Sequence, residues 1–185
     1  KGVTLYVRAD AQDCVQVIPR TEWTNVLYEA GRGLVNIHEA SRYFFQVAKG
    51  VSTASSINGL QVNFAESDAM LRSIIEGSIT DEISVPPTQA IANTLVAGWT
   101  KWANFKSHME TNMYSPNLTR ALLMEAVDLG SQAQASAASG AEMLTQAAHL
   151  AVGTLPTETI ATAFRLGSLI AELATEALLQ SLEIP

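Results

Sequence analysis

The sequence predicts a mainly α-helical protein, a single-domain helical bundle of about five to six helices that follows a short extended or β N-terminal segment. The chain has 185 residues, of which 48% are apolar and 16% are charged, so one domain can bury a sizeable core. Apolar side chains after Thr21 recur at spacings of three and four, as on one face of a helix. We find no repeat of about 20 to 50 residues and no sustained heptad. We therefore expect residues 1–20 to be extended and residues 21–185 to form one helical domain.

The N-terminal segment is rich in residues that favour β-strands. Residues 3–7 read Val-Thr-Leu-Tyr-Val, and Val15 and Val17 alternate with glutamines. Pro19 then interrupts the pattern. One or two short extended segments are expected before the first helix.

The first amphipathic helix is expected to run from Thr21, as a plausible N-cap, to a stop at Gly50. Gly31 and Gly33 fall inside it. Each glycine lowers helix stability by about 1 kcal/mol relative to alanine. They predict a kink, a break or a close helix crossing.

The next stretch predicts a loop and then a second helix. Residues 51–58 are rich in serine and are expected to form a loop. The helix is expected to begin near Ser67, with the side chains of Ser67 and Asp68 available for capping, and to end at Gly77. Residues 80–87 then form a connection, because paired prolines cannot continue a helix.

A third helix is expected from Thr88, and it is the most aromatic part of the chain. Trp99, Trp102 and Phe105 recur on it at helical spacing. Such residues most often form core, with a partner-binding surface or a membrane-interface anchor as alternatives.

Two further helices are expected after a break at residues 115–117. The first restarts at Leu118 and continues through the alanine-rich residues 130–153, with a break near Gly140 as an open alternative. The last begins at residues 155–158, a helix-start signal. Its apolar face is widened by further leucines, so we expect it to be buried on more than one side. These leucines are Leu166, Leu169 and Leu173.

The acidic balance of the chain argues against several partners. Eighteen acidic residues against eleven basic ones give a formal net charge of -7, so we expect no nucleic-acid binding. After Glu110 only Arg120 and Arg165 are basic, so this half would be repelled by an anionic membrane. No apolar stretch reads as a membrane span, because the closest candidate, residues 83–100, is split by two prolines.

The sequence does not fix the cellular compartment of the protein. Cys14 is the only cysteine, which excludes an intrachain disulfide and a cysteine-based zinc cluster. It favours an inert thiol, with an intermolecular disulfide as the alternative. The sequence starts at Lys1, and a secreted or processed product is slightly favoured over a cytoplasmic one. The sequon at Asn117 matters only in a secreted protein.

The sequence predicts no catalytic residue, no cofactor and no metal ligand. His38, His108 and His149 fall on three different expected helices, and none has a second histidine at the spacing of a metal site. Glu172 and Glu176 lie four apart, a spacing that can present two carboxylates together but more often belongs to a solvated face.

We therefore expect a non-enzymatic helical protein that acts through self-association or through docking to another protein. The alternative is a secreted membrane-active toxin or effector whose C-terminal helices rearrange, and a membrane partner belongs to that alternative only. An enzyme without a recognisable motif is the third hypothesis. The residues expected to contribute to an interaction surface are Trp99, Trp102, Phe105, Phe164, Leu169 and Leu173.

Overall fold

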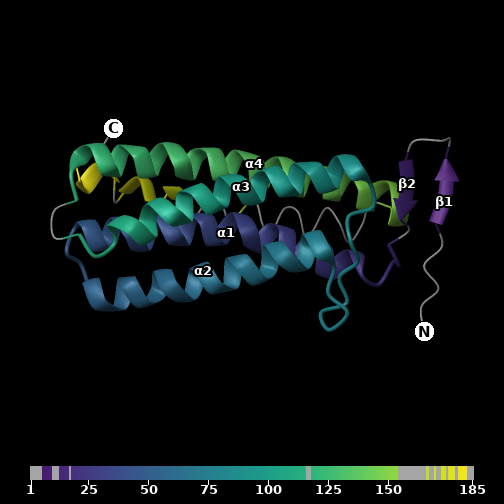
Figure 1. Cartoon of the computed structure of the whole chain (residues 1–185), viewed down its shortest axis with the longest axis horizontal. Coiled ribbons are helices and arrows are strands. Elements are labelled where there is room, and N and C mark those ends of the chain that lie inside the picture. The colour runs from purple at the N-terminus through teal and green to yellow at the C-terminus, as the bar shows by residue number, and fades with distance from the viewer. Residues whose placement is uncertain are drawn as a thin grey trace.

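A computed structural model gives the structure of most of the chain. It describes residues 6–9, 13–16, 18–115, 118–153, 166, 169, 172–173, 175–177 and 179–182. Four long helices run antiparallel along one axis (Figure 1). They are α1 (Trp23–Ala48), α2 (Thr53–Glu76), α3 (Gln89–Asn112) and α4 (Arg120–Val152).

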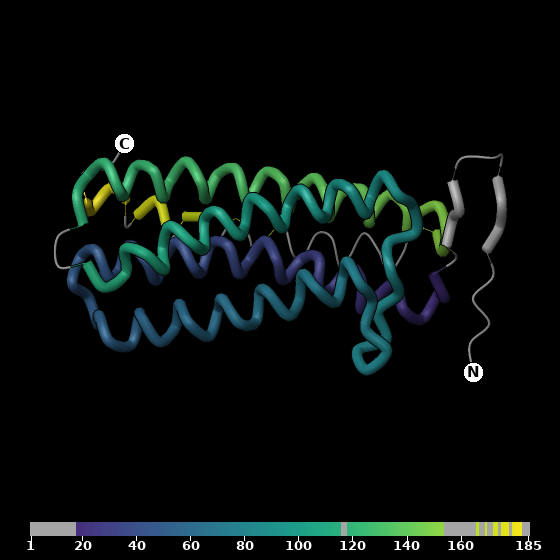
Figure 2. Tube along the Cα trace, in the orientation of Figure 1, coloured from purple at the N-terminus to yellow at the C-terminus, as the bar shows by residue number. Residues whose placement is uncertain are grey.

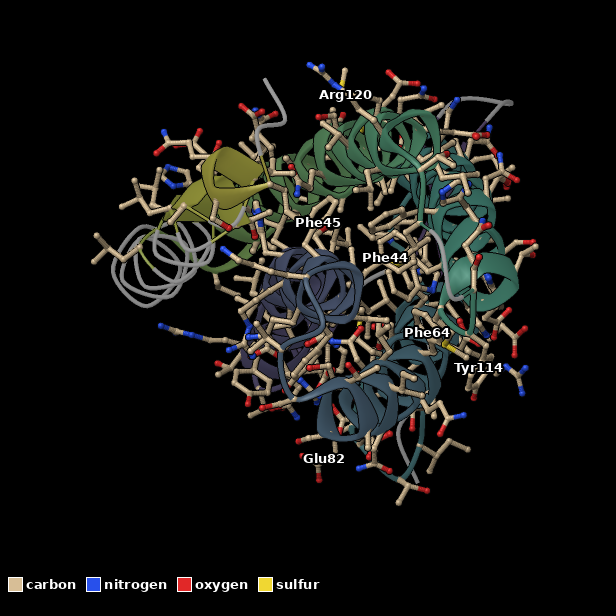
Figure 3. The ribbon with its side chains drawn as sticks, turned by 90° about the vertical axis from the view of Figure 1, so that its left-hand side faces the viewer. Phe44, Phe45, Phe64, Glu82, Tyr114 and Arg120 are labelled. Carbon is tan, nitrogen blue, oxygen red and sulfur yellow. The ribbon has the colours of Figure 1, made fainter. Side chains whose placement is uncertain are left out.

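The four helices enclose one interior. Helix α1 packs against α2 and α4, and α3 packs against α4 and, less extensively, against α2. Seen from the end, the helices surround a core into which Phe44 and Phe64 project (Figure 3). Helical residues between positions 166 and 181, shown in yellow, lie beside this bundle (Figure 2). The expected mainly α-helical bundle is confirmed.

The N-terminal segment contains two short strands, β1 (Tyr6–Ala9) and β2 (Asp13–Gln16). They pair antiparallel, with Val7 opposite Val15 and Arg8 opposite Cys14. This agrees with the extended N-terminal segment that the β-forming residues predict.

Helix α1 begins at Trp23 rather than directly after Thr21. Its N-cap is Glu22, which makes no side-chain capping hydrogen bond, so the predicted Thr21 cap is wrong. The helix continues through Gly31 and Gly33 without a break. A Cβ at Gly33 would lie 3.1 Å from Met70 Cε, so this glycine allows the close crossing of α1 and α2.

Helix α2 begins about four turns earlier than the sequence pattern predicts. The predicted loop at residues 51–58 is wrong, because residues from Thr53 onward are helical and only residues 49–52 connect α1 to α2. The hydroxyl of buried Ser56 donates to Gln46 Oε1 (3.1 Å) and to the Val51 carbonyl oxygen (3.3 Å), so serine is satisfied inside the helix. Ser52 has a φ of 46°, and this left-handed conformation lets the chain turn from α1 into α2 within a few residues.

The start of α3 at Thr88 is confirmed. The Thr88 hydroxyl accepts a hydrogen bond from the Ile91 amide (3.3 Å), and the backbone of Thr88 is extended, as expected at an N-cap. The connection before it, predicted from the paired prolines, contains an isolated antiparallel bridge between Ser78 and Ile83. This short loop projects from the side of the bundle (Figure 1).

Helix α4 is continuous, so the alternative of a break near Gly140 is wrong. A Cβ at Gly140 would lie only 2.9 Å from Leu95 Cδ2 of α3. The glycine therefore marks the close contact of two helices rather than an interruption of one.

Candidate functional site

A pocket opens between α1, α4 and four described C-terminal residues, Glu172, Thr175, Glu176 and Leu179. It encloses about 180 Å³, and we call it the His38 pocket. His38 and Ser41 line it from α1, Gln134 and Ser131 from α4, and Glu172, Thr175 and Glu176 from the C-terminal residues. Apolar walls are supplied by Phe45, Val127 and Leu179. Figure 3 shows Phe45 on the side of α1 that faces α4 and the yellow C-terminal residues.

His38 forms the polar wall of this pocket. Its side chain is buried, and Gln134 Nε2 lies 3.1 Å from His38 Nδ1. When the amide of Gln134 donates this hydrogen bond, the neutral imidazole carries its proton on Nε2. Burial lowers the pKa of His38, and the negative charge of Glu172 offsets this in part. The imidazole is therefore uncharged at neutral pH.

Glu172 and Glu176 lie on the C-terminal side of the pocket, one helical turn apart. Both residues are exposed. Neither makes an ion pair with a lysine or arginine within the described part of the chain. The mouth of the pocket is thus negatively charged, while its walls are apolar or neutral.

The pocket offers the carboxylate oxygens of Glu172 and Glu176 as hydrogen-bond acceptors, whereas the Nδ1 lone pair of His38 already accepts from Gln134. Among the residues that the structure describes, no three histidine, cysteine, aspartate or glutamate side chains are placed to hold a metal ion. The other two histidines do not converge on His38. His108 Nε2 donates to the Leu122 carbonyl oxygen (2.9 Å), and His149 is exposed near the end of α4.

The three aromatic residues of α3 are core, or packed against core, rather than surface. Trp102 is 2% exposed and Phe105 is 0% exposed, and Trp99 is half-buried against the same cluster. Phe64, Trp102 and Phe105 make edge-to-face ring contacts at 6.0 and 6.2 Å between centroids. Trp102 and Phe105 therefore cannot belong to an interaction surface while the bundle is folded, because their rings are already enclosed.

Three leucines among the described C-terminal residues are exposed. Leu166, Leu169 and Leu173, which we call the leucine stripe, are 57%, 54% and 65% exposed. Their spacing places them on one helix face, while Leu179 and Leu182 pack against the bundle core. The expectation that these three leucines are buried is wrong, because the segment uses a different face against α1 and α4. Phe164, the remaining predicted residue, lies outside the described residues.

Sequence reasoning identified His38, Glu172 and Glu176 separately but not as one site. Ser41, Ser131, Gln134 and Thr175 were missed, since a serine, glutamine or threonine on an alanine-rich helix carries no signal of its own. Only the packing of the C-terminal residues against α1 and α4 brings them together.

Comparisons of this chain with protein-family models, with curated proteins and with solved structures found no match.

Proposed function

We propose that this chain is a non-enzymatic assembly protein that associates with a second copy of itself through the leucine stripe. The observation that carries the proposal is the exposure of Leu166, Leu169 and Leu173, each more than half exposed on one helix face. Single exposed apolar residues are normal on a protein surface, but an aligned set at helical spacing is typical of a docking face.

The character of this face favours a second copy. Ala177 and Gln180 continue the stripe toward the C-terminus, and both are exposed and uncharged. Glu172 and Glu176 border this face, but both are exposed, so their carboxylates can stay in water at the rim of the contact while the leucines pair. Most homo-oligomers are two-fold dimers in which one patch contacts itself, and a uniform apolar stripe meets that condition.

The size of the stripe predicts weak association. Full burial of a leucine contributes about 1.5–3 kcal/mol, so about half of that is available for each of the three leucines of each copy. Association itself costs about 4–15 kcal/mol. The most favourable difference between these terms is about 5 kcal/mol, which corresponds to a dissociation constant of about 0.2 mM, so the dimer should form only at high local concentration.

Sedimentation equilibrium tests this proposal directly. The wild-type chain should show a mass that rises with concentration toward that of a dimer. The triple variant Leu166→Gln, Leu169→Gln, Leu173→Gln should remain monomeric. A matched control replaces three other exposed apolar residues, Val62, Val96 and Leu150, by glutamine and should dimerise like the wild type. A wild-type monomer at about 1 mM, or equal dimerisation of all three proteins, would overturn the proposal.

A membrane surface is the alternative binding partner of the leucine stripe. No helix in the described ranges is long and apolar enough to cross a bilayer. Flotation with phosphatidylcholine vesicles should leave the wild-type protein in the soluble fraction. Vesicle binding that is lost in the triple glutamine variant, with the protein monomeric, would instead support the membrane-active alternative.

A further inference from the structure

The His38 pocket brings together two carboxylates, a buried imidazole and an apolar wall. Glu172 and Glu176 stand at its mouth without a cationic partner in the described part of the chain. Glu142 also makes no such ion pair in the described part of the chain, but it does not line this pocket. An uncompensated pair of carboxylates beside an apolar cavity attracts a positive group.

The interior of the pocket sets the size and polarity of what can enter. A water molecule occupies about 30 Å³ in the liquid, so a space of this size holds about five or six non-hydrogen atoms. Phe45, Val127 and Leu179 offer a surface to which hydrocarbon can pack. A neutral imidazole at the wall does not repel a cation, whereas the carboxylates do repel an anion.

We propose that the His38 pocket binds a small organic cation, a primary alkylammonium whose charged group lies between Glu172 and Glu176 and whose hydrocarbon chain lies against Phe45, Val127 and Leu179. The ammonium group donates hydrogen bonds to the two carboxylates. The chain displaces water from the apolar wall. Glu172 and Glu176 border the leucine stripe, because Glu176 follows Leu169 by seven residues and Leu173 by three, whereas the cavity lies on the side that faces α1 and α4. The titration that tests the site therefore uses protein dilute enough to stay monomeric.

A titration with n-pentylamine, followed by amide and histidine-ring NMR signals near neutral pH, tests the proposal. At that pH the amine is protonated. The wild-type protein should show saturable shifts concentrated at His38, Ser131, Gln134 and Thr175, with a dissociation constant of about 1 mM. Pentan-1-ol and pentanoate, which have the same chain length without the positive charge, should bind more weakly or not at all.

Two variants test separately how much the carboxylates and the cavity contribute to amine binding. Glu172→Gln with Glu176→Gln should weaken n-pentylamine binding about fivefold, since exposed charge pairs are individually weak. Ser131→Leu narrows the pocket from α4 without removing a charge and should weaken binding as well. The control Glu76→Gln with Glu142→Gln removes the same charge from exposed positions elsewhere and should bind like the wild type.

Three results would overturn the proposal. The first is shifts that rise linearly with amine concentration, and the second is equal binding of n-pentylamine and pentan-1-ol. The third is an unchanged affinity in the Glu172→Gln, Glu176→Gln variant with shifts still at His38. Because both glutamates are exposed, glutamine at these positions leaves the core intact, and the wild-type NMR spectrum provides the check on folding.

Discussion

The indole Nε1 of Trp102 donates a hydrogen bond to Asp68 Oδ1 at 3.0 Å and so connects α3 to α2. The other oxygen of the same carboxylate accepts from Lys106 Nζ at 2.6 Å. Burial of Lys106 lowers its pKa, but the hydrogen bond and negative charge of Asp68, with those of Glu110, outweigh this and raise the pKa overall. Helices α2 and α3 contact each other less extensively than the other three neighbouring pairs do (α1 with α2, α1 with α4 and α3 with α4), so this one carboxylate is an important tether between them.

Replacing Asp68 by alanine should destabilise the protein by about 1–3 kcal/mol, because the buried indole N–H of Trp102 loses its acceptor. The ion pair between Asp68 and Lys106 contributes less to the free energy of unfolding, since it is partly exposed and solvent screens it. Asp68→Asn retains an acceptor for Trp102 and should cost clearly less. Urea unfolding measures both values. Equal losses for the two variants would show that the charge, not the hydrogen bond to Trp102, is what matters.

Gly140→Ala should destabilise the protein although alanine favours helix. The added Cβ would lie 2.9 Å from Leu95 Cδ2, and overpacking of this kind costs about 1–3 kcal/mol. Gly98→Ala is the matched control on α3, because the nearest atom, Ser136 Oγ, is 3.4 Å away. That variant should be neutral or gain up to about 1 kcal/mol from helix propensity.

A double substitution tests the cause of the Gly140 effect. When Leu95→Ala is combined with Gly140→Ala, the loss in unfolding free energy should be smaller than the two single losses together. Additive losses would mean that Leu95 is not the side chain that excludes a Cβ at position 140.

The stability of the protein should fall on acidification in a way that depends on His38. The pKa of His38 is lowered in the folded state from its usual 6.5. Just below pH 6.5 the unfolded chain therefore binds more protons than the folded one, so the stabilisation is complete above pH 6.5 and is lost as the pH falls. His38→Gln should remove this part of the pH dependence. Identical profiles for the two proteins between neutral pH and pH 5 would contradict the assignment, with pH 5 taken as about the lower end of histidine titration.

The buried polar contact between α1 and α2 should respond differently to single and double replacement. Asn36 Nδ2 donates to Ser67 Oγ at 3.2 Å, and both residues are buried. Asn36→Ala should cost about 1–3 kcal/mol, because it leaves a cavity and removes the donor to Ser67 Oγ, which keeps only its longer hydrogen bond to Asn63 Oδ1 (3.5 Å). Asn36→Leu combined with Ser67→Ala should recover most of that loss in thermal or urea unfolding. No recovery would indicate that shape, rather than hydrogen bonding, determines the identity of residue 36.

Periodicity in the sequence was sufficient to predict the helical bundle, and it failed where polar residues are buried. The serines of residues 52–56 resemble a loop because serine favours turns, yet Ser56 is enclosed and hydrogen-bonded in α2. Ser67 and Asp68 resemble an N-cap for the same reason, although they lie in the middle of α2 and bond to Asn36, Trp102 and Lys106. A local pattern cannot show that a polar side chain has a partner on another helix.

The candidate site could be predicted only in fragments. The helical spacing of Leu166, Leu169 and Leu173 placed them together but could not tell which face of the segment packs against α1 and α4. His38 and Glu172 are far apart in the chain, and nothing in their neighbours signals that they meet. The site arises from tertiary packing and so lies beyond the range of periodicity arguments.

Cysteine cross-linking locates the proposed contact between copies most directly. In a Cys14→Ser background, Leu169→Cys places a single thiol in the leucine stripe, and Ala135→Cys places one at an exposed position on α4 as the control. Under mild oxidation, the Leu169→Cys protein should form a disulfide dimer much faster than the Ala135→Cys protein, because a disulfide requires Cβ atoms about 3.5–4.5 Å apart. Equal and slow cross-linking at both positions would contradict self-association through the leucine stripe.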